Sequence, residues 1–179
     1  MQIGEVIEST PVLVGGVTAG ATLLAVVVTS LFNIRVTRLN IDAQAQQKAK
    51  ALRIAKLEEL YFLFDKWQLN LSGIYLHHLR CYRGKLTCRQ VMDLVNAPGL
   101  LAPGEAQKYR MVMELHFPSL ATDYAQVEAT RRRVVPFLSD PAVSKLGATE
   151  FVACQVAFES ACEAFKSKIS ALAHEALAS

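Results

Sequence analysis

Residues 151–176 read FVACQVAFESACEAFKSKISALAHEA, and this stretch decides the fold class. Large apolar side chains recur in it every seven residues: Phe151, Phe158, Phe165 and Leu172. Smaller apolar side chains fill the alternate positions of the same helical face: Cys154, Cys162, Ile169 and Ala176. Such a face is typical of a helix packed in a bundle or coiled coil. With Gly147 ahead of it, the pattern predicts one final helix of about thirty residues.

A second apolar face lies in the middle of the chain, where residues 35–83 contain no proline and no glycine before Gly73. One long helix is therefore expected there. Apolar or half-polar side chains are spaced by three and four residues along it: Leu60, Phe64, Trp67, Leu71, Ile74, His78 and Cys81. This spacing again predicts a helix with one buried side.

Shorter helices are expected between these two. Thr87-Cys-Arg-Gln90 has the form of a capping box, which predicts a helix to about Ala97. Another is expected from Glu105 to about Phe117, after which Pro118 can begin a new turn. The next apolar face comprises Leu120, Tyr124, Val127, Val134 and Leu138. Because sustained period-two alternation is missing, the predicted fold is all-α, an antiparallel helical bundle.

An uncharged stretch precedes the bundle. Residues 11–32 read PVLVGGVTAGATLLAVVVTSLF, and no Asp, Glu, Lys or Arg occurs between Ser9 and Ile34. As a helix this run is about 33 Å long, enough to cross a hydrocarbon core of about 30 Å. We therefore predict a transmembrane helix over residues 11–34, with Thr10 as N-cap and Pro11 at the first helical position.

A cleaved signal peptide is the competing interpretation of this stretch. Signal peptides begin with positive charge and end at small residues. Here Glu5 and Glu8 precede the run, and Asn33-Ile34-Arg35 is a poor cleavage site. These residues favour the membrane span.

Basic residues follow the span. Six occur in residues 35–56, namely Arg35, Arg38, Lys48, Lys50, Arg53 and Lys56. Against Asp42 they give 6 − 1 = +5, whereas the first ten residues contain no Lys or Arg. The positive-inside rule then places the N-terminus outside and the C-terminal part in the cytoplasm. Arg35 and Arg38 are candidates for contact with lipid headgroups, with a solvated helix face as the alternative.

The predicted organisation therefore has four parts. They are an extracytoplasmic N-terminus (residues 1–10), the span (11–34), a basic helical stalk (35–55) and a cytosolic bundle (56–179). Within the span, Gly16 and Gly20 form a G-x-x-x-G pattern that lets a second helix approach closely. Self-association through them is a hypothesis, because the pattern also occurs by chance.

Candidates for chemistry are few. His77, His78 and Cys81 fall on neighbouring turns of one helix, but a zinc site needs three or four ligands, and packed side chains explain them better. Cys154 and Cys162 lie about 12 Å apart along their helix, too far for a disulfide. We expect all four cysteines to be reduced thiols.

A catalytic role for either cysteine of the final helix would require His116 or His174 to fold against it. Glu159 is expected to pair with Lys166 on the helix surface. No known catalytic or phosphate-binding motif occurs, so we predict no enzyme activity, cofactor, metal or small-molecule substrate. A net charge of +3 is too mild to indicate a nucleic-acid partner.

The densest basic cluster is Arg131, Arg132 and Arg133. It could contact lipid headgroups, a phosphate or an acidic partner. Three successive residues point in different directions around a helix, so a solvated face with one stem packed along the bundle is the alternative.

Three segments taken together resemble a group of mostly uncharacterised bacterial single-pass membrane proteins with a helical cytosolic domain. They are Lys56 to Trp67, Gly84 to Val95 and Met113 to Leu120 with Tyr124. The resemblance implies a bacterial inner membrane and carries no catalytic or binding residue.

The function expected from these observations is a non-enzymatic, membrane-tethered interaction or assembly protein that binds lipid and either itself or a protein partner. One alternative is a membrane-perturbing oligomeric effector, for example in phage defence or toxicity. Another is an accessory subunit of a larger membrane complex.

Overall fold

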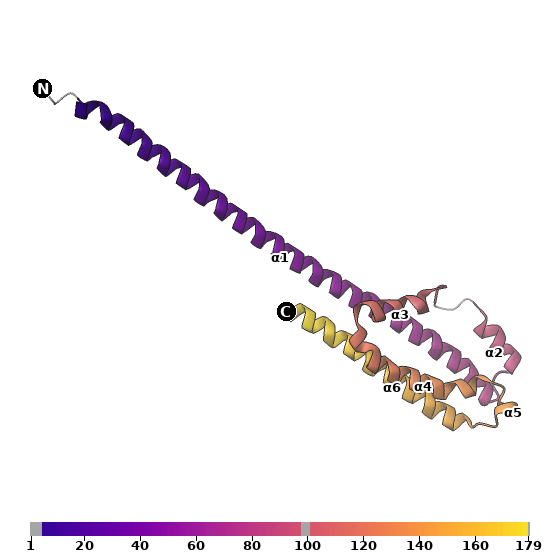
Figure 1. The fold of residues 1–179 in the computed structure, drawn as a ribbon. Coiled ribbons are helices and arrows are strands. Elements are labelled where there is room, and N and C mark those ends of the chain that lie inside the picture. Colours follow the sequence, from indigo (N-terminus) through magenta and orange to yellow (C-terminus); the bar gives the residue numbers. More distant parts are fainter. Residues whose placement is uncertain (1–4, 98–100, 179) are drawn as a thin grey trace. The chain divides into compact units, whose positions relative to one another are not determined.

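Every regular element in the part that the structure describes is a helix (Figure 1). The computed structural model describes the backbone of residues 5–97 and 101–178, and within them all side chains except those of residues 5–21, 23 and 24. The long helices are α1 (Glu5–Tyr82), α3 (Glu105–His116), α4 (Ala121–Val134) and α6 (Ala148–Ala178). The short elements are α2 (Cys88–Val95), η1 (Pro118–Leu120), η2 (Val135–Leu138) and α5 (Pro141–Ser144). The all-α prediction is confirmed.

The chain divides into two compact units, Met1–Ala49 and Lys50–Ser179. In the first unit, every side chain that the structure describes is exposed. No helix made of described residues is both long and apolar enough to cross a membrane. Most of the predicted span, including Gly16 and Gly20, lies outside the residues whose side chains are described.

Helix α1 begins at Glu5, earlier than the start predicted at Pro11. Residues 5–10 contain neither glycine nor proline, and the helix that they form continues through Pro11, its seventh residue. At its other end α1 stops at Tyr82, and Gly84 follows with a φ of 67°. Glycine adopts this left-handed conformation without steric cost, which allows the chain to turn away from the helix.

Helix α6 lies antiparallel to α1 in the second unit. Phe64 of α1 contacts Phe165 of α6 with ring centroids 4.7 Å apart. Eighteen residues further along α1, Tyr82 contacts Phe151, which comes earlier in α6, at 5.4 Å. Because α1 residue numbers rise while α6 numbers fall, the two helices run in opposite directions.

The other two long helices alternate in the same way. In α3, Glu105 pairs with Lys66 of α1 and Lys108 pairs with Glu59, so α3 is antiparallel to α1. In α4, Tyr124 contacts Phe165 at 5.7 Å, and α4 runs on through η2 to Phe137, which stacks on Phe151 at 4.9 Å. Helix α4 is therefore antiparallel to α6, and the predicted antiparallel bundle is confirmed.

One hydrophobic core fills this bundle, and all three predicted apolar faces contribute to it. Phe151, Phe158 and Phe165 of α6 are each at most 1% exposed. On α1, the predicted face residues Leu71 and Ile74 are only half-buried. Tyr75 and Leu79 are buried there instead. An α-helix has 3.6 residues per turn, so a face spaced by 3.5 residues drifts by about 20° per heptad. The buried side of α1 therefore follows the 3.6-residue turn of the helix and departs from the predicted 3.5-residue spacing.

Candidate functional site

The predicted basic cluster at the end of α4 does not form a single site. The side chain of Arg131 is 31% exposed and bonds to Glu128, with Nε and Nη2 lying 3.1 and 2.9 Å from Oε2. Arg132 and Arg133 are exposed. The structure thus agrees with one packed arginine stem and two solvated ones. Of the three, Arg132 and Arg133 are the ones exposed for contact with an anionic partner.

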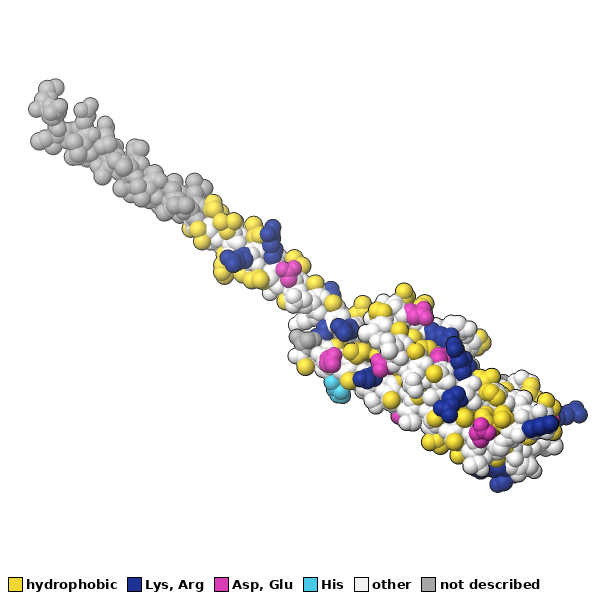
Figure 2. Space-filling model, turned by 60° about the horizontal axis from the view of Figure 1, so that its bottom comes forward, with side chains coloured by type: hydrophobic (Ala, Val, Ile, Leu, Met, Phe, Trp, Pro, Cys, Tyr) yellow, Lys and Arg dark blue, Asp and Glu magenta, His cyan; other side chains and the backbone are white. Residues whose placement is uncertain are grey.

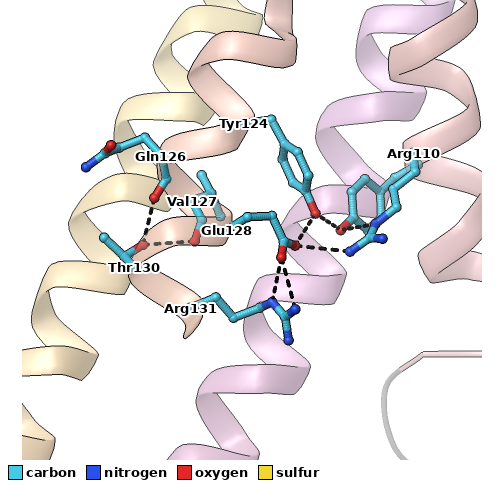
Figure 3. A network of polar contacts seen from close by, with 8 residues as sticks. Arg110, Tyr124, Gln126, Val127, Glu128, Thr130 and Arg131 are labelled. Atoms are coloured by element: carbon cyan, nitrogen blue, oxygen red, sulfur yellow. Dashed lines mark hydrogen bonds and ion pairs between the residues drawn. The ribbon is translucent and has the colours of Figure 1, made fainter. Parts of the chain in front are cut away.

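Glu128 is the centre of a polar cluster between α3 and α4 (Figure 3). We call this the Glu128 cluster; it comprises Tyr109, Arg110, Tyr124, Glu128 and Arg131. The Tyr124 hydroxyl donates to Glu128 Oε1 at 2.6 Å, and Arg110 Nη2 lies 3.0 Å from the same oxygen. The hydroxyls of Tyr109 and Tyr124 are 2.7 Å apart in the buried part of the cluster.

The ionisation of this cluster does not suit acid–base chemistry near neutral pH. Burial opposes ionisation of Glu128, but hydrogen bonds from Tyr124 and Arg131 outweigh it and lower the pKa of the carboxyl group. Burial, followed by the hydrogen bond to Glu128, raises the pKa of Tyr124. The carboxylate stays charged and the phenol stays neutral, so the two do not exchange a proton. They join α4 to α3 through Arg110 and Tyr109.

A second ion pair, which the sequence reasoning misassigned, joins α1 to α6. Lys166 Nζ lies 2.8 Å from Asp65 of α1 and 2.7 Å from Glu163, and its side chain is 11% exposed. The expected partner, Glu159, instead accepts a hydrogen bond from Gln155 at 3.0 Å. Positions seven apart are two turns away from each other, whereas a spacing of three brings side chains together.

The remaining cysteine and histidine candidates are not assembled into a site. Cys154 and Cys162 are buried, and burial raises the pKa of the Cys162 thiol to about 12. His116 and His174 are exposed. Burial and the neighbouring His77 lower the pKa of His78, which is 8% exposed. Among described residues, no group of three or more potential ligands could hold a metal.

A shallow groove of about 300 Å³ lies between α1 and α6. Its lining consists of Leu57, Glu58, Tyr61, Ile169, Ser170 and Ala173. Ligand sites usually occupy about 300 to 1,000 Å³ and enclose most of the ligand. This groove is at the small end of that range and open, so it does not indicate a specific small molecule.

One exposed apolar surface of α1 faces away from the core. Phe62, Leu69 and Leu76 are 65%, 53% and 43% exposed and recur every seven residues. We call these three residues the α1 outer face. Figure 2 shows that hydrophobic side chains also reach the surface of the bundle among its charged groups. The outer face was not predicted, although the sequence contains its seven-residue spacing.

The structure also brings together two cysteines that the sequence did not predict to be in contact. Cys81 and Cys88 lie on either side of the turn at Gly84, and their sulfur atoms are 3.1 Å apart. Helical periodicity does not predict how side chains meet across a turn, so no sequence pattern predicted this contact.

No protein-family model, curated protein sequence or solved structure matches this chain.

Proposed function

We propose that this chain is a non-enzymatic, membrane-tethered interaction or assembly protein of a bacterial inner membrane. In this proposal residues 11–34 form the span, residues 35–55 form the stalk, and the cytosolic bundle binds a second copy or another protein. The observation that carries the proposal is the α1 outer face. It leaves Phe62, Leu69 and Leu76 in water on a helix whose opposite side fills the core.

The spacing of the outer face favours a helical partner. Residues seven apart stay on one side of a helix over successive turns, and a partner helix can pack along such a line. Burying one large apolar side chain contributes about 1.5 to 3 kcal/mol relative to full exposure. Three partly exposed side chains therefore supply a useful fraction of the free energy of a protein–protein contact.

The interaction is tested by reversing the polarity of that face in the full-length protein. The triple variant Phe62→Glu, Leu69→Glu and Leu76→Glu is expected to lose the self-association or partner retention seen for the wild type in mild detergent. The matched control is Val143→Glu with Val156→Glu, which changes two exposed valines, 76% and 58% exposed, on other helices. Cross-linking and light scattering measure the assembly, and circular dichroism checks that each variant folds.

The proposal fails if the wild type is monomeric and retains no protein when taken from native membranes. It also fails if the triple variant associates as well as the control. Substrate turnover by the purified protein that point changes abolish would contradict the non-enzymatic part.

The membrane anchor has its own test. The uncharged run over residues 11–34 and the basic residues after it support the span. Arginine near the centre of a membrane helix costs about 2.5 to 3.5 kcal/mol. Leu23→Arg with Val27→Arg is therefore expected to move the protein from the membrane pellet to the supernatant after ultracentrifugation, whereas Leu23→Ala with Val27→Ala stays in the pellet. Wild-type protein found in the supernatant would refute the anchor.

A further inference from the structure

The turn between α1 and α2 brings two thiols into contact. Cys81 lies in the last turn of α1 and Cys88 is the first residue of α2. Their Sγ atoms are 3.1 Å apart, and both side chains are half-buried, so reagents in solution can reach the pair. Neither is bonded to another cysteine. The two side chains therefore already point at each other.

The backbone holds this geometry from both sides of the turn. Lys85 donates its backbone N–H to the carbonyl of Arg80 at 2.8 Å, which closes the end of α1. Thr87 and Gln90 form a reciprocal capping box that begins α2. Cys88 is thus positioned by a helix cap.

We propose that Cys81 and Cys88 form a redox modification site that closes to a reversible intramolecular disulfide. The oxidant would be a low-molecular-weight disulfide of the glutathione class. One protein thiolate attacks it to give a mixed disulfide and releases one small thiol. The second cysteine then attacks the mixed disulfide and releases the other. Two protons and two electrons pass from the protein to the reagent, which leaves as two thiols.

Polar groups and burial affect the ionisation of the pair. The hydrogen bond with Cys81, together with burial and the carboxylate of Asp140, raises the pKa of the Cys88 thiol to about 12. Whichever thiol attacks first, the other sulfur lies 3.1 Å away and can attack the mixed disulfide. Asp140 is the N-cap of α5, whose side chain accepts from the N–H of Ala142, so it is a fixed neighbour of the pair.

A disulfide fits this site better than a metal ion does. A structural zinc site needs four ligands, and within the described ranges no third ligand joins the two sulfurs in a metal-binding group. Disulfides in a reducing compartment are usually transient and regulatory, which suits a half-buried pair in a turn. The geometry of the pair does not depend on the proposed function, and only the reducing compartment is taken from it.

The other two cysteines provide an internal comparison. Cys154 and Cys162 are 7% and 0% exposed. They lie eight residues apart on one helix, about 12 Å along its axis. They can neither pair with each other nor meet a reagent in solution while the bundle is folded.

The test titrates the reduced full-length protein in mild detergent with mixtures of oxidised and reduced glutathione. Thiols are counted after acid quenching and unfolding, and peptides are mapped by mass spectrometry without reduction. Two of the four thiols are expected to disappear together, with a cross-linked peptide joining Cys81 to Cys88, and reductant restores both. Cys154→Ala should behave as the wild type.

Two single variants make the test decisive. Cys88→Ser and Cys81→Ser are expected to abolish the intramolecular bond and to leave a glutathione adduct on the remaining cysteine; circular dichroism verifies their folding. The proposal is overturned if the wild type keeps all four thiols or gains only single adducts. It is also overturned if Cys88→Ser still loses two thiols to an intramolecular bond.

Discussion

Glu128 accepts hydrogen bonds from Arg110, Tyr124 and Arg131, which come from two different helices. A carboxylate that is only 18% exposed needs such partners, because an unpaired buried charge is costly. Tyr109 completes the arrangement in the core, where its hydroxyl bonds to that of Tyr124. Hydrogen bonds from Tyr109 and Arg110 thus connect α3 to Tyr124 and Glu128 of α4.

Replacing Tyr124 with Phe removes the hydroxyl that links Glu128 to Tyr109. We expect the free energy of unfolding to fall by about 1 to 2 kcal/mol, because the Glu128 carboxylate and the Tyr109 hydroxyl each lose a hydrogen-bond partner. The measurement is urea denaturation followed by circular dichroism. Tyr61→Phe is the matched control, since Tyr61 is 38% exposed, and it should leave the midpoint unchanged. Equal midpoints for the two variants would contradict a stabilising role for the cluster.

Glu59 predicts a dependence of stability on pH. Hydrogen bonds from Lys108 and Lys56 lower its pKa from 4.5 to about 2. Because the folded pKa lies below the unfolded one, the contribution is complete above about pH 4.5 and disappears as the pH falls towards 2. Glu59→Gln should be less stable than the wild type by about 1 kcal/mol at pH 7, and this gap should close in acid. Glu114→Gln, at an exposed position on α3, should show no such gap.

Helix α6 shows how one element organises the bundle. Its phenylalanines meet α1 at three levels: Phe165 with Phe64, Phe158 with Trp67 and Tyr75, and Phe151 with Tyr82. The repeat of seven residues predicted this face correctly, because helical periodicity is a local property of the chain. The ion pair of Lys166 with Asp65 could not be predicted in the same way, because it depends on how α6 is set against α1.

Truncating the middle phenylalanine should be costly. Phe158 is fully buried against Trp67 and Tyr75, so Phe158→Ala is expected to lower the free energy of unfolding by about 3 to 5 kcal/mol. Val156→Ala, two residues away and 58% exposed, should change it by less than about 0.5 kcal/mol. Thermal or urea unfolding compares the two. Similar losses would mean that α6 does not pack through this face.

At the scale of the whole molecule, the core belongs to the second compact unit. Every buried residue of the core cluster lies between Leu57 and Ile169, within the unit that begins at Lys50. A unit with its own core can fold by itself.

Residues 50–179, produced without the first unit, are therefore expected to be helical and monodisperse and to unfold in one cooperative transition. Circular dichroism and differential scanning calorimetry measure this. The fragment carrying Phe158→Ala serves as a destabilised reference. A broad, non-cooperative transition for the unmodified fragment would show that the bundle needs residues before Lys50.

The sequence by itself determined that the fold is all-α, where most helices lie and which side of α6 is buried. These features depend on the periodicity of apolar residues and on local breakers such as Gly84 and Gly147. Only the tertiary structure decided the rest. It turned the buried side of α1 towards Tyr75, left Phe62, Leu69 and Leu76 outside, and joined Lys166 to Asp65 and Cys81 to Cys88. Contacts between helices depend on their rotation and relative height in the bundle, and many distant residues together determine both.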